Sequence, residues 1–219
     1  MCGNKKSLEQ PGIRDSLLEF HKKWYSSNIM TLCLIGKHDI ATMEGWVNQR
    51  FSPVKNFDVV LPDLSEPKPY PVANLNKFIK FVPVKDVDKM SFVFFLPYCQ
   101  RDHKTQPLKY LAELIGHEGE GSLLSFLKEE NLANECCSDI DHWADCITIF
   151  TIEIKLTKNA LDHTDKVVEA TYQYLQKIRD AGVQKYFSEE INEVGAMNFK
   201  YSDKKAEVDT VVDFAKAMQ

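Results

Sequence analysis

Apolar and polar side chains alternate along residues 146–156, most regularly from Phe150 onward. The apolar positions share one side of an extended chain: Phe150, Ile152, Ile154 and Leu156. This alternation is typical of a β-strand that buries one face and exposes the other. Two further apolar runs, at residues 78–84 and 90–96, also predict strands, so we expect a sheet in this part of the chain.

Apolar residues at helical spacing predict helices on both sides of these strands. The expected helices are residues 13–25, 40–51 with Asp39 as its cap, 107–115, a run opened by Ser122, a long helix capped by Thr157, 184–199, and a last helix that starts near Ser202. The order of strands and helices predicts an α+β fold. We expect two layers, with helices packed on one face of an antiparallel or mixed sheet.

The first sixty residues contain a single expected strand, an apolar run at residues 30–35 that ends at Gly36. A continuous apolar run suits a strand that is buried on both faces. It has no partner strand nearby, so we expect this piece to be the end of a larger unit. A proline-rich linker follows at residues 61–76, and it divides the chain into predicted domains at residues 1–60 and 77–219.

Composition limits the possible functions. The chain has 219 residues, of which 44% are hydrophobic, and this is enough for a substantial core. The net charge is -5 with dispersed basic residues, which argues against a nucleic-acid partner. No apolar run is long enough for a membrane span. The six cysteines include no Cys-x-x-Cys pair, so we expect reduced thiols and a cytoplasmic location.

The strongest candidate for a binding site is a glycine-rich corner between two expected helices. Gly116, Gly119 and Gly121 fall within six residues and surround the His117–Glu118 pair. Glycine permits unusual backbone angles and the close approach of another chain. We therefore expect a tight turn that can receive a neighbouring polypeptide.

Catalytic interpretations of this region are weaker than structural ones. A zinc-protease motif of the form His-Glu-x-x-His would need a histidine at position 121, where the chain has glycine. Ser122 has no nucleophile-elbow context and is better explained as a helix N-cap. A metal set is conceivable within one short segment, but adjacent cysteines rarely reach one ion: Cys136, Cys137, His142 and Cys146.

Two long motifs resemble the insulinase (pitrilysin-type) zinc metallopeptidases, and in particular the insulin-degrading enzyme and nardilysin members. These motifs are RDSLLEFHKKWYSSNIMTLCLIG at residues 14–36 and LIGHEGEGSLLSFLK at residues 114–128. The similarity extends over residues 3–205 in the same order and spacing. It implies a metallopeptidase-like α+β domain.

The resemblance also implies the place of this chain in a larger peptidase. Members hold zinc through His-x-x-Glu-His in a first domain, and that motif is absent here. Residues 1–60 resemble the C-terminal part of that first domain, and residues 77–219 resemble an incomplete second domain without zinc. We thus expect a fragment of a zinc metalloendopeptidase that is inactive alone and binds no cofactor. Its partners would be peptide substrates and the remaining domains of the parent peptidase.

In this family the second domain anchors the extended N-terminal end of a peptide substrate. The resemblance places the anchor at Gly116, His117, Glu118, Gly119, Cys136, Cys137, Ser138, Asp139 and Ile140. Members often have glycines where this chain has Ser138 and Asp139. The Cβ atoms of these two residues would narrow the groove, or the added carboxylate of Asp139 would instead favour a cationic peptide end. The alternative for His117 and Glu118 is that they only brace the corner. The alternative function is a non-catalytic scaffold or interaction protein of the same fold.

Overall fold

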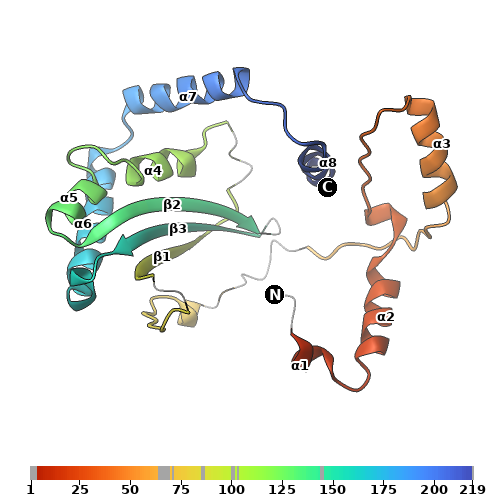
Figure 1. The fold of residues 1–219 in the computed structure, drawn as a ribbon, viewed down its shortest axis with the longest axis horizontal. Coiled ribbons are helices and arrows are strands. Elements are labelled where there is room, and N and C mark those ends of the chain that lie inside the picture. Colours follow the sequence, from red (N-terminus) through yellow and green to blue (C-terminus); the bar gives the residue numbers. More distant parts are fainter. Residues whose placement is uncertain are drawn as a thin grey trace. The chain divides into compact units, whose positions relative to one another are not determined.

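The computed structural model describes residues 4–63, 70, 72–84, 87–99, 102, 104–143 and 146–218. The chain divides into two compact units, which are considered separately (Figure 1). The terminal unit combines Met1–Pro62 with Ser202–Gln219, and the central unit is Asp63–Tyr201. All nine residues of the expected anchor belong to the central unit.

The central unit is built on a three-stranded antiparallel sheet. Its strands are β1 (Lys89–Leu96), β2 (Ala133–Trp143) and β3 (Ile147–Leu156), in the spatial order β1-β3-β2. Because β3 occupies the centre, β2 forms one edge of this sheet.

The alternation in β3 has the predicted consequence. Ile152 lies opposite Phe92 of β1 and Ser138 of β2, so these three residues share one face of the sheet. Ile152 and Ile154 are fully buried, whereas Lys155 is exposed. We call the buried side the helix face and the opposite side the outer face.

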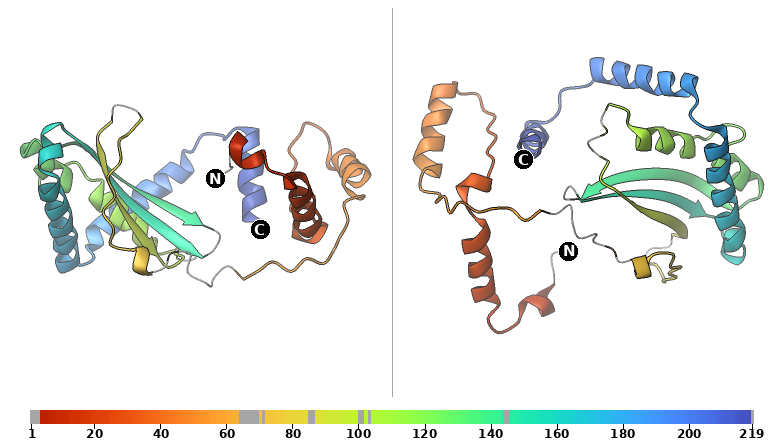
Figure 2. Two further views of the ribbon diagram at one scale, coloured as in Figure 1. Left: turned by 90° about the horizontal axis from the view of Figure 1, so that it is seen from below. Right: turned by 180° about the vertical axis from the view of Figure 1, so that it is seen from behind.

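Three helices pack on the helix face: α4 (Pro107–Ile115), α5 (Leu123–Glu129) and α6 (Thr164–Ala181) (Figures 1 and 2). Leu127 of α5 and Val167 of α6 meet Ile152 in one core, and all three are fully buried. Burial of each such side chain stabilises the fold by roughly 1.5–3 kcal/mol. The predicted α+β class is confirmed.

The remaining helical segments of the central unit are η2 (Val72–Asn74), η4 (Asn159–Asp162) and α7 (Lys185–Lys200). Thr157 caps the short η4 turn rather than the long helix, because its Oγ1 accepts a hydrogen bond from the Ala160 amide. The Tyr110 hydroxyl of α4 accepts a hydrogen bond from the Gln184 amide at 2.9 Å, just before α7 begins.

The terminal unit contains α1 (Lys5–Leu8), α2 (Ile13–Trp24), η1 (Ser27–Ile29), α3 (Ile40–Phe51) and α8 (Glu207–Ala217). Asp39 caps α3 as predicted, since its Oδ1 accepts the Thr42 amide at 2.9 Å. Among the described residues of this unit, Ser26 alone is buried, and no apolar side chain is. These helices therefore have amphipathic faces without a common core.

Two expected strands are wrong. Residues 30–35 and 78–84 carry no strand, and their apolar side chains are largely exposed; Val84 is fully so. Both runs have β-type composition, but a strand forms only where a neighbouring strand accepts its backbone hydrogen bonds. No described segment provides that neighbour.

No helix in the described ranges is long and apolar enough to cross a lipid bilayer.

Candidate functional site

The glycine-rich corner is a compact turn whose shape depends on His117 and Gly119. The Gly119 amide donates a hydrogen bond of 3.0 Å to His117 Nδ1, so the imidazole ring folds back over the turn. A Cβ at Gly119 would lie 2.5 Å from His117 Cε1, so any other residue type would force the exposed imidazole ring to move. Gly121 has a φ of +78°, in the left-handed region where glycine is favoured.

The last turn of α4 is held by its own helix, by β2 and by α6, and this fixes where the corner begins. The last carbonyls of a helix have no partners within the helix and need others. Ala112 O accepts the Gly116 amide at 2.9 Å and Ser138 Oγ at 3.0 Å. Leu114 O accepts the Tyr174 hydroxyl at 3.2 Å.

The five expected anchor residues of β2 alternate between the two faces of the sheet. Cys136, Ser138 and Ile140 face the helices, whereas Cys137 and Asp139 are exposed on the outer face. Strand side chains stand perpendicular to the sheet. The side chains of Ser138 and Asp139 therefore leave the strand above and below it, and neither projects along the edge.

Cys136 connects β2 to the corner in the protein interior. Its Sγ lies 3.9 Å from the Ile115 carbonyl oxygen, one residue before Gly116. Burial, and secondarily the neighbouring Cys137, raise the pKa of the Cys136 thiol to about 11. Burial also raises the pKa of Tyr174, with a smaller contribution from Cys136. Both groups are thus uncharged at neutral pH.

The edge of β2 that points away from β3 carries unpaired backbone groups. In the described part of the chain, β3 is the only strand that pairs with β2. No other backbone hydrogen bond of a described segment reaches residues 134–142. Every second residue of β2 therefore presents its N–H and C=O groups to whatever lies beside the edge.

The structure brings the anchor together only in part. Gly116 follows the turn that contacts Cys136 and Ser138. His117 and Glu118 are exposed, and no hydrogen bond or ion pair within the described ranges joins either side chain to β2. No ion pair between described residues includes Glu118, whose carboxylate follows the C-terminal end of α4, where the helix dipole is negative.

The described residues do not fit a zinc ion. They contain no group of three His, Cys, Asp or Glu side chains close enough to hold a metal. The segment that suggested a metal set is dispersed, because Cys136 and Cys137 lie on opposite faces of β2. His142 Nδ1 instead lies 2.9 Å from Thr148 Oγ1.

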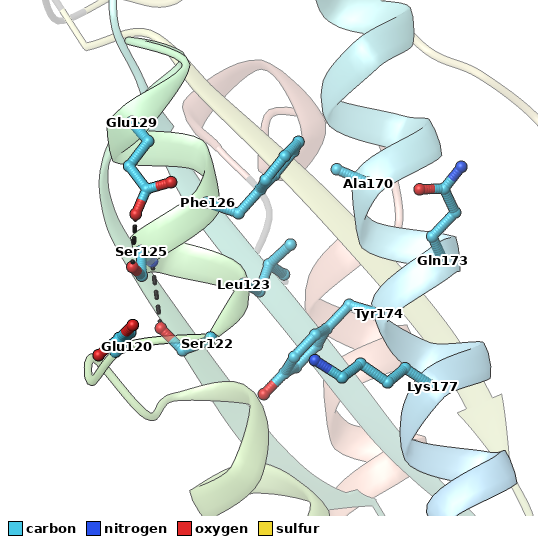
Figure 3. Close-up of a pocket in the computed structure, with 11 residues that line it drawn as sticks. Glu120, Ser122, Leu123, Ser125, Phe126, Glu129, Ala170, Gln173, Tyr174 and Lys177 are labelled. Carbon is cyan, nitrogen blue, oxygen red and sulfur yellow. Dashed lines mark hydrogen bonds between the residues drawn. The ribbon is translucent and has the colours of Figure 1, made fainter.

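A different hollow, an open pocket of about 430 Å³, lies between α5 and α6 (Figure 3). Its serines are already engaged: Ser122 Oγ caps α5 by accepting the Ser125 amide, and Ser125 Oγ donates to Glu129 Oε1. The N-cap role predicted for Ser122 is confirmed. Both hydroxyls thus have local structural roles in α5.

Sequence reasoning missed two residues of the β2 edge. The strand continues to Trp143, so Asp141 and Trp143 follow Asp139 on the outer face, and Trp143 is 56% exposed. The alternation of Asp139, Ile140 and Asp141 is the signal that would have found Asp141, whereas Trp143 breaks this alternation and has no such signal. A second pocket of about 270 Å³ lies on the helix face, lined in part by Leu108, Ile140 and His142.

Comparisons with known proteins agree with this architecture. Residues 12–193 match the family described as Peptidase M16 inactive domain. The insulin-degrading enzymes of Drosophila melanogaster and Homo sapiens are 33% and 36% identical, over 99% and 93% of this chain. The A-factor-processing enzyme of Saccharomyces cerevisiae is 34% identical over 94% of it.

The chain spans 20–22% of the length of these relatives. The crystal structure of pitrilysin superposes with a TM-score of 0.81 at 22% identity, covering 99% of this chain and 23% of pitrilysin. That likeness shows a shared fold. With the family match over most of its residues, the chain belongs to the M16 peptidases, the insulinase or pitrilysin-type family that its motifs resemble.

Proposed function

We propose that this chain is the peptide-anchoring, non-catalytic part of an M16 zinc metalloendopeptidase that degrades unstructured peptides. The single observation that carries the proposal is the unpaired edge of β2 beside the glycine-rich corner. Residues 1–60 would belong to a catalytic-type domain, residues 61–76 would link it onward, and residues 77–219 would form the zinc-less domain.

An unpaired strand edge binds extended peptides through main-chain hydrogen bonds. Such bonds do not depend on the side chains of the peptide, so one edge accepts many sequences. This suits an enzyme that degrades varied peptides. The edge residues would be Cys136, Cys137, Ser138, Asp139 and Ile140.

The corner would bind the free α-amino group of the peptide. Glu118 supplies an exposed carboxylate, and the C-terminal end of α4 adds its negative dipole. Gly116 and Gly119 let the peptide approach the turn closely, and His117 braces it through the Gly119 amide. A peptide lying along β2 would then start at a fixed point.

Hydrolysis would be performed by zinc held in another part of the peptidase, since the residues described here offer no metal site. The full chain incubated with zinc and a quenched fluorescent peptide should therefore show no turnover. Chelator-sensitive cleavage by this chain would overturn the proposal.

Binding of fluorescent peptides to the full chain, measured by anisotropy, tests the anchor. We expect a free-amine peptide to bind more tightly than its N-acetylated form. Methylation of successive backbone amides should abolish binding, because it removes the donors that pair with β2. Glu118→Gln should lower the affinity for the free-amine peptide by roughly two- to fivefold, which is the effect of losing one exposed charge pair.

The matched control is Glu113→Gln, an exposed carboxylate on α4 before the corner. It should leave both affinities unchanged. Equal effects of Glu113→Gln and Glu118→Gln would mean that net charge, not the corner, attracts the amine.

The alternative function, a stand-alone scaffold protein, predicts capped apolar faces, whereas exposed side chains of the terminal unit, such as Leu17 at 58% and Phe20 at 57%, favour a piece of a larger peptidase. Exposed patches of this kind mark interaction surfaces. Light scattering of the purified chain would separate the two functions. A monodisperse protein that binds no peptide supports the scaffold, whereas peptide binding supports the anchor.

A further inference from the structure

Four charges on the outer face of the sheet neutralise one another. Lys89 Nζ lies 2.6 Å from Glu153 Oε2, and Lys155 pairs with Glu135. The second pair spans β3 and β2 at directly opposed positions, Glu135 and Lys155. Opposite charges placed across neighbouring strands are a recognised source of sheet stability.

Asp139 and Asp141 have no such partner. They lie opposite Thr151 and Ile149, neither of which is charged. Both carboxylates are exposed, and no ion pair in the described part of the chain includes them. Two like charges on one face of an edge strand repel each other, and nothing on the β3 side offsets them.

We propose that the β2 edge selects peptides in which two basic residues flank one apolar residue. This inference rests on the proposed peptide-anchoring function and names the substrate class of that site. The two basic side chains would lie opposite Asp139 and Asp141. The central apolar side chain would lie opposite Ile140.

The period of a strand requires this pattern. Side chains of a paired strand alternate between faces, so residues at positions i and i+2 both project to the outer face. Directly opposed Cβ atoms on neighbouring strands are about 4.5–5.5 Å apart, within reach of lysine and arginine. The pattern reads the same in both directions, so it suits a parallel or an antiparallel peptide.

The helix face supplies the apolar half of the selection. Ile140 is half-buried and borders the pocket of about 270 Å³. Pro107 and Leu108 make the part of its lining next to Ile140 apolar, while Asp102 and Lys109 add charged groups to the rest. A residue opposite Ile140 would project toward this pocket. An apolar side chain there would lie against Ile140, Pro107 and Leu108 and bury apolar surface, which favours binding.

Trp143 adds a third side chain to the outer-face positions of β2 that Asp139 and Asp141 occupy. It is 56% exposed, lies on the outer face opposite Ile147, and follows Asp141 by two residues. An exposed indole ring attracts lysine and arginine through its π-electron face. A third basic residue, two positions beyond the pair, would therefore strengthen binding further.

The test compares peptides that differ only in a central triplet, titrated against the full chain by fluorescence anisotropy. The triplets are Lys-Leu-Lys, Gln-Leu-Gln, Glu-Leu-Glu and Lys-Lys-Leu. The last has the same composition as the first but can place only one lysine on the outer face in any register. We expect Lys-Leu-Lys to bind about three- to tenfold more tightly than Gln-Leu-Gln.

The double variant Asp139→Asn/Asp141→Asn should bind Lys-Leu-Lys and Gln-Leu-Gln with equal affinity. Its control, Asp162→Asn/Asp180→Asn, makes the same change in net charge at exposed positions away from the sheet and should keep the preference. Binding of Gln-Leu-Gln by the double variant shows that it is folded.

Each outcome separates the two proposals. If Lys-Lys-Leu binds as tightly as Lys-Leu-Lys, or if the preference survives the double variant, the selection is overturned. Equal binding of all triplets, still abolished by backbone methylation, also overturns it and leaves the anchor intact. If no peptide binds at all, the anchoring function fails and the selection fails with it.

Discussion

Gly119 is the residue on which the shape of the corner depends. Any side chain at this position would collide with the His117 ring, whose Cε1 would be 2.5 Å from the new Cβ. We expect Gly119→Ala to destabilise the protein by about 0.5–1.5 kcal/mol, because the exposed ring must rotate away and give up one hydrogen bond. That bond is the one from the Gly119 amide to His117 Nδ1. Urea unfolding followed by circular dichroism measures the change.

Gly195→Ala in α7 is the matched control for this substitution. Its Cβ would make an ordinary contact with Lys109 Nζ at 3.7 Å. Replacing a glycine in a helix interior by alanine stabilises it by about 0.5–1 kcal/mol. Similar effects of the two substitutions would contradict the role assigned to the His117 ring.

Cys136 makes stability sensitive to alkaline pH. Burial raises the pKa of its thiol from an ordinary 9.0 to about 11, so the folded state favours the protonated form. This stabilisation is fully present below pH about 9 and is lost as the pH rises through about 11. The urea midpoint should fall more between pH 9 and pH 11 in the natural protein than in Cys136→Ala.

The exposed Cys137 provides the comparison. Cys137→Ala should keep most of the alkaline loss, since burial is the larger cause of the raised Cys136 pKa and only the smaller contribution of Cys137 is removed. Parallel profiles for Cys136→Ala and the natural protein would show that the buried thiol is not the source of the alkaline loss.

At the scale of elements, local signals decided which predictions succeeded. The alternation in β3, the proline at the start of α4 and the serine cap of α5 each act within a few residues, and the structure has all three elements. Residues 30–35 and 78–84 failed because an apolar run becomes a strand only beside another strand. Nothing in the sequence locates that neighbour.

The edge position of β2 could not be read from periodicity, because strand order is a property of the sheet. The resemblance supplied the segment at residues 136–140, and the structure extends it to Trp143. That extension brings Asp141 into the row with Asp139. To recognise the two unpaired carboxylates, one must therefore know both the boundaries of β2 and its register with β3.

At the scale of the whole molecule, stability is distributed unevenly between the two units. The central unit has a continuous core under its sheet, whereas no described apolar side chain of the terminal unit is buried. Helices gain most of their stability from burial of an apolar face, and short helices without it are marginal in water. The α2 and α3 helices, of twelve residues each, are in this range.

Hydrogen exchange of the full chain, followed by mass spectrometry, should therefore give two classes of amide. Amides of β3 and α5 should exchange slowly, because opening them exposes the core. Amides of α2 and α3 should exchange within seconds to minutes.

Leu127→Ala, which removes a fully buried side chain at a cost of about 2–5 kcal/mol, should accelerate exchange in the central unit. Leu17→Ala in α2, where the side chain is 58% exposed, should leave that exchange unchanged. If α2 is as protected as β3 at two protein concentrations tenfold apart, the terminal unit has a stability of its own that its exposed apolar faces do not explain.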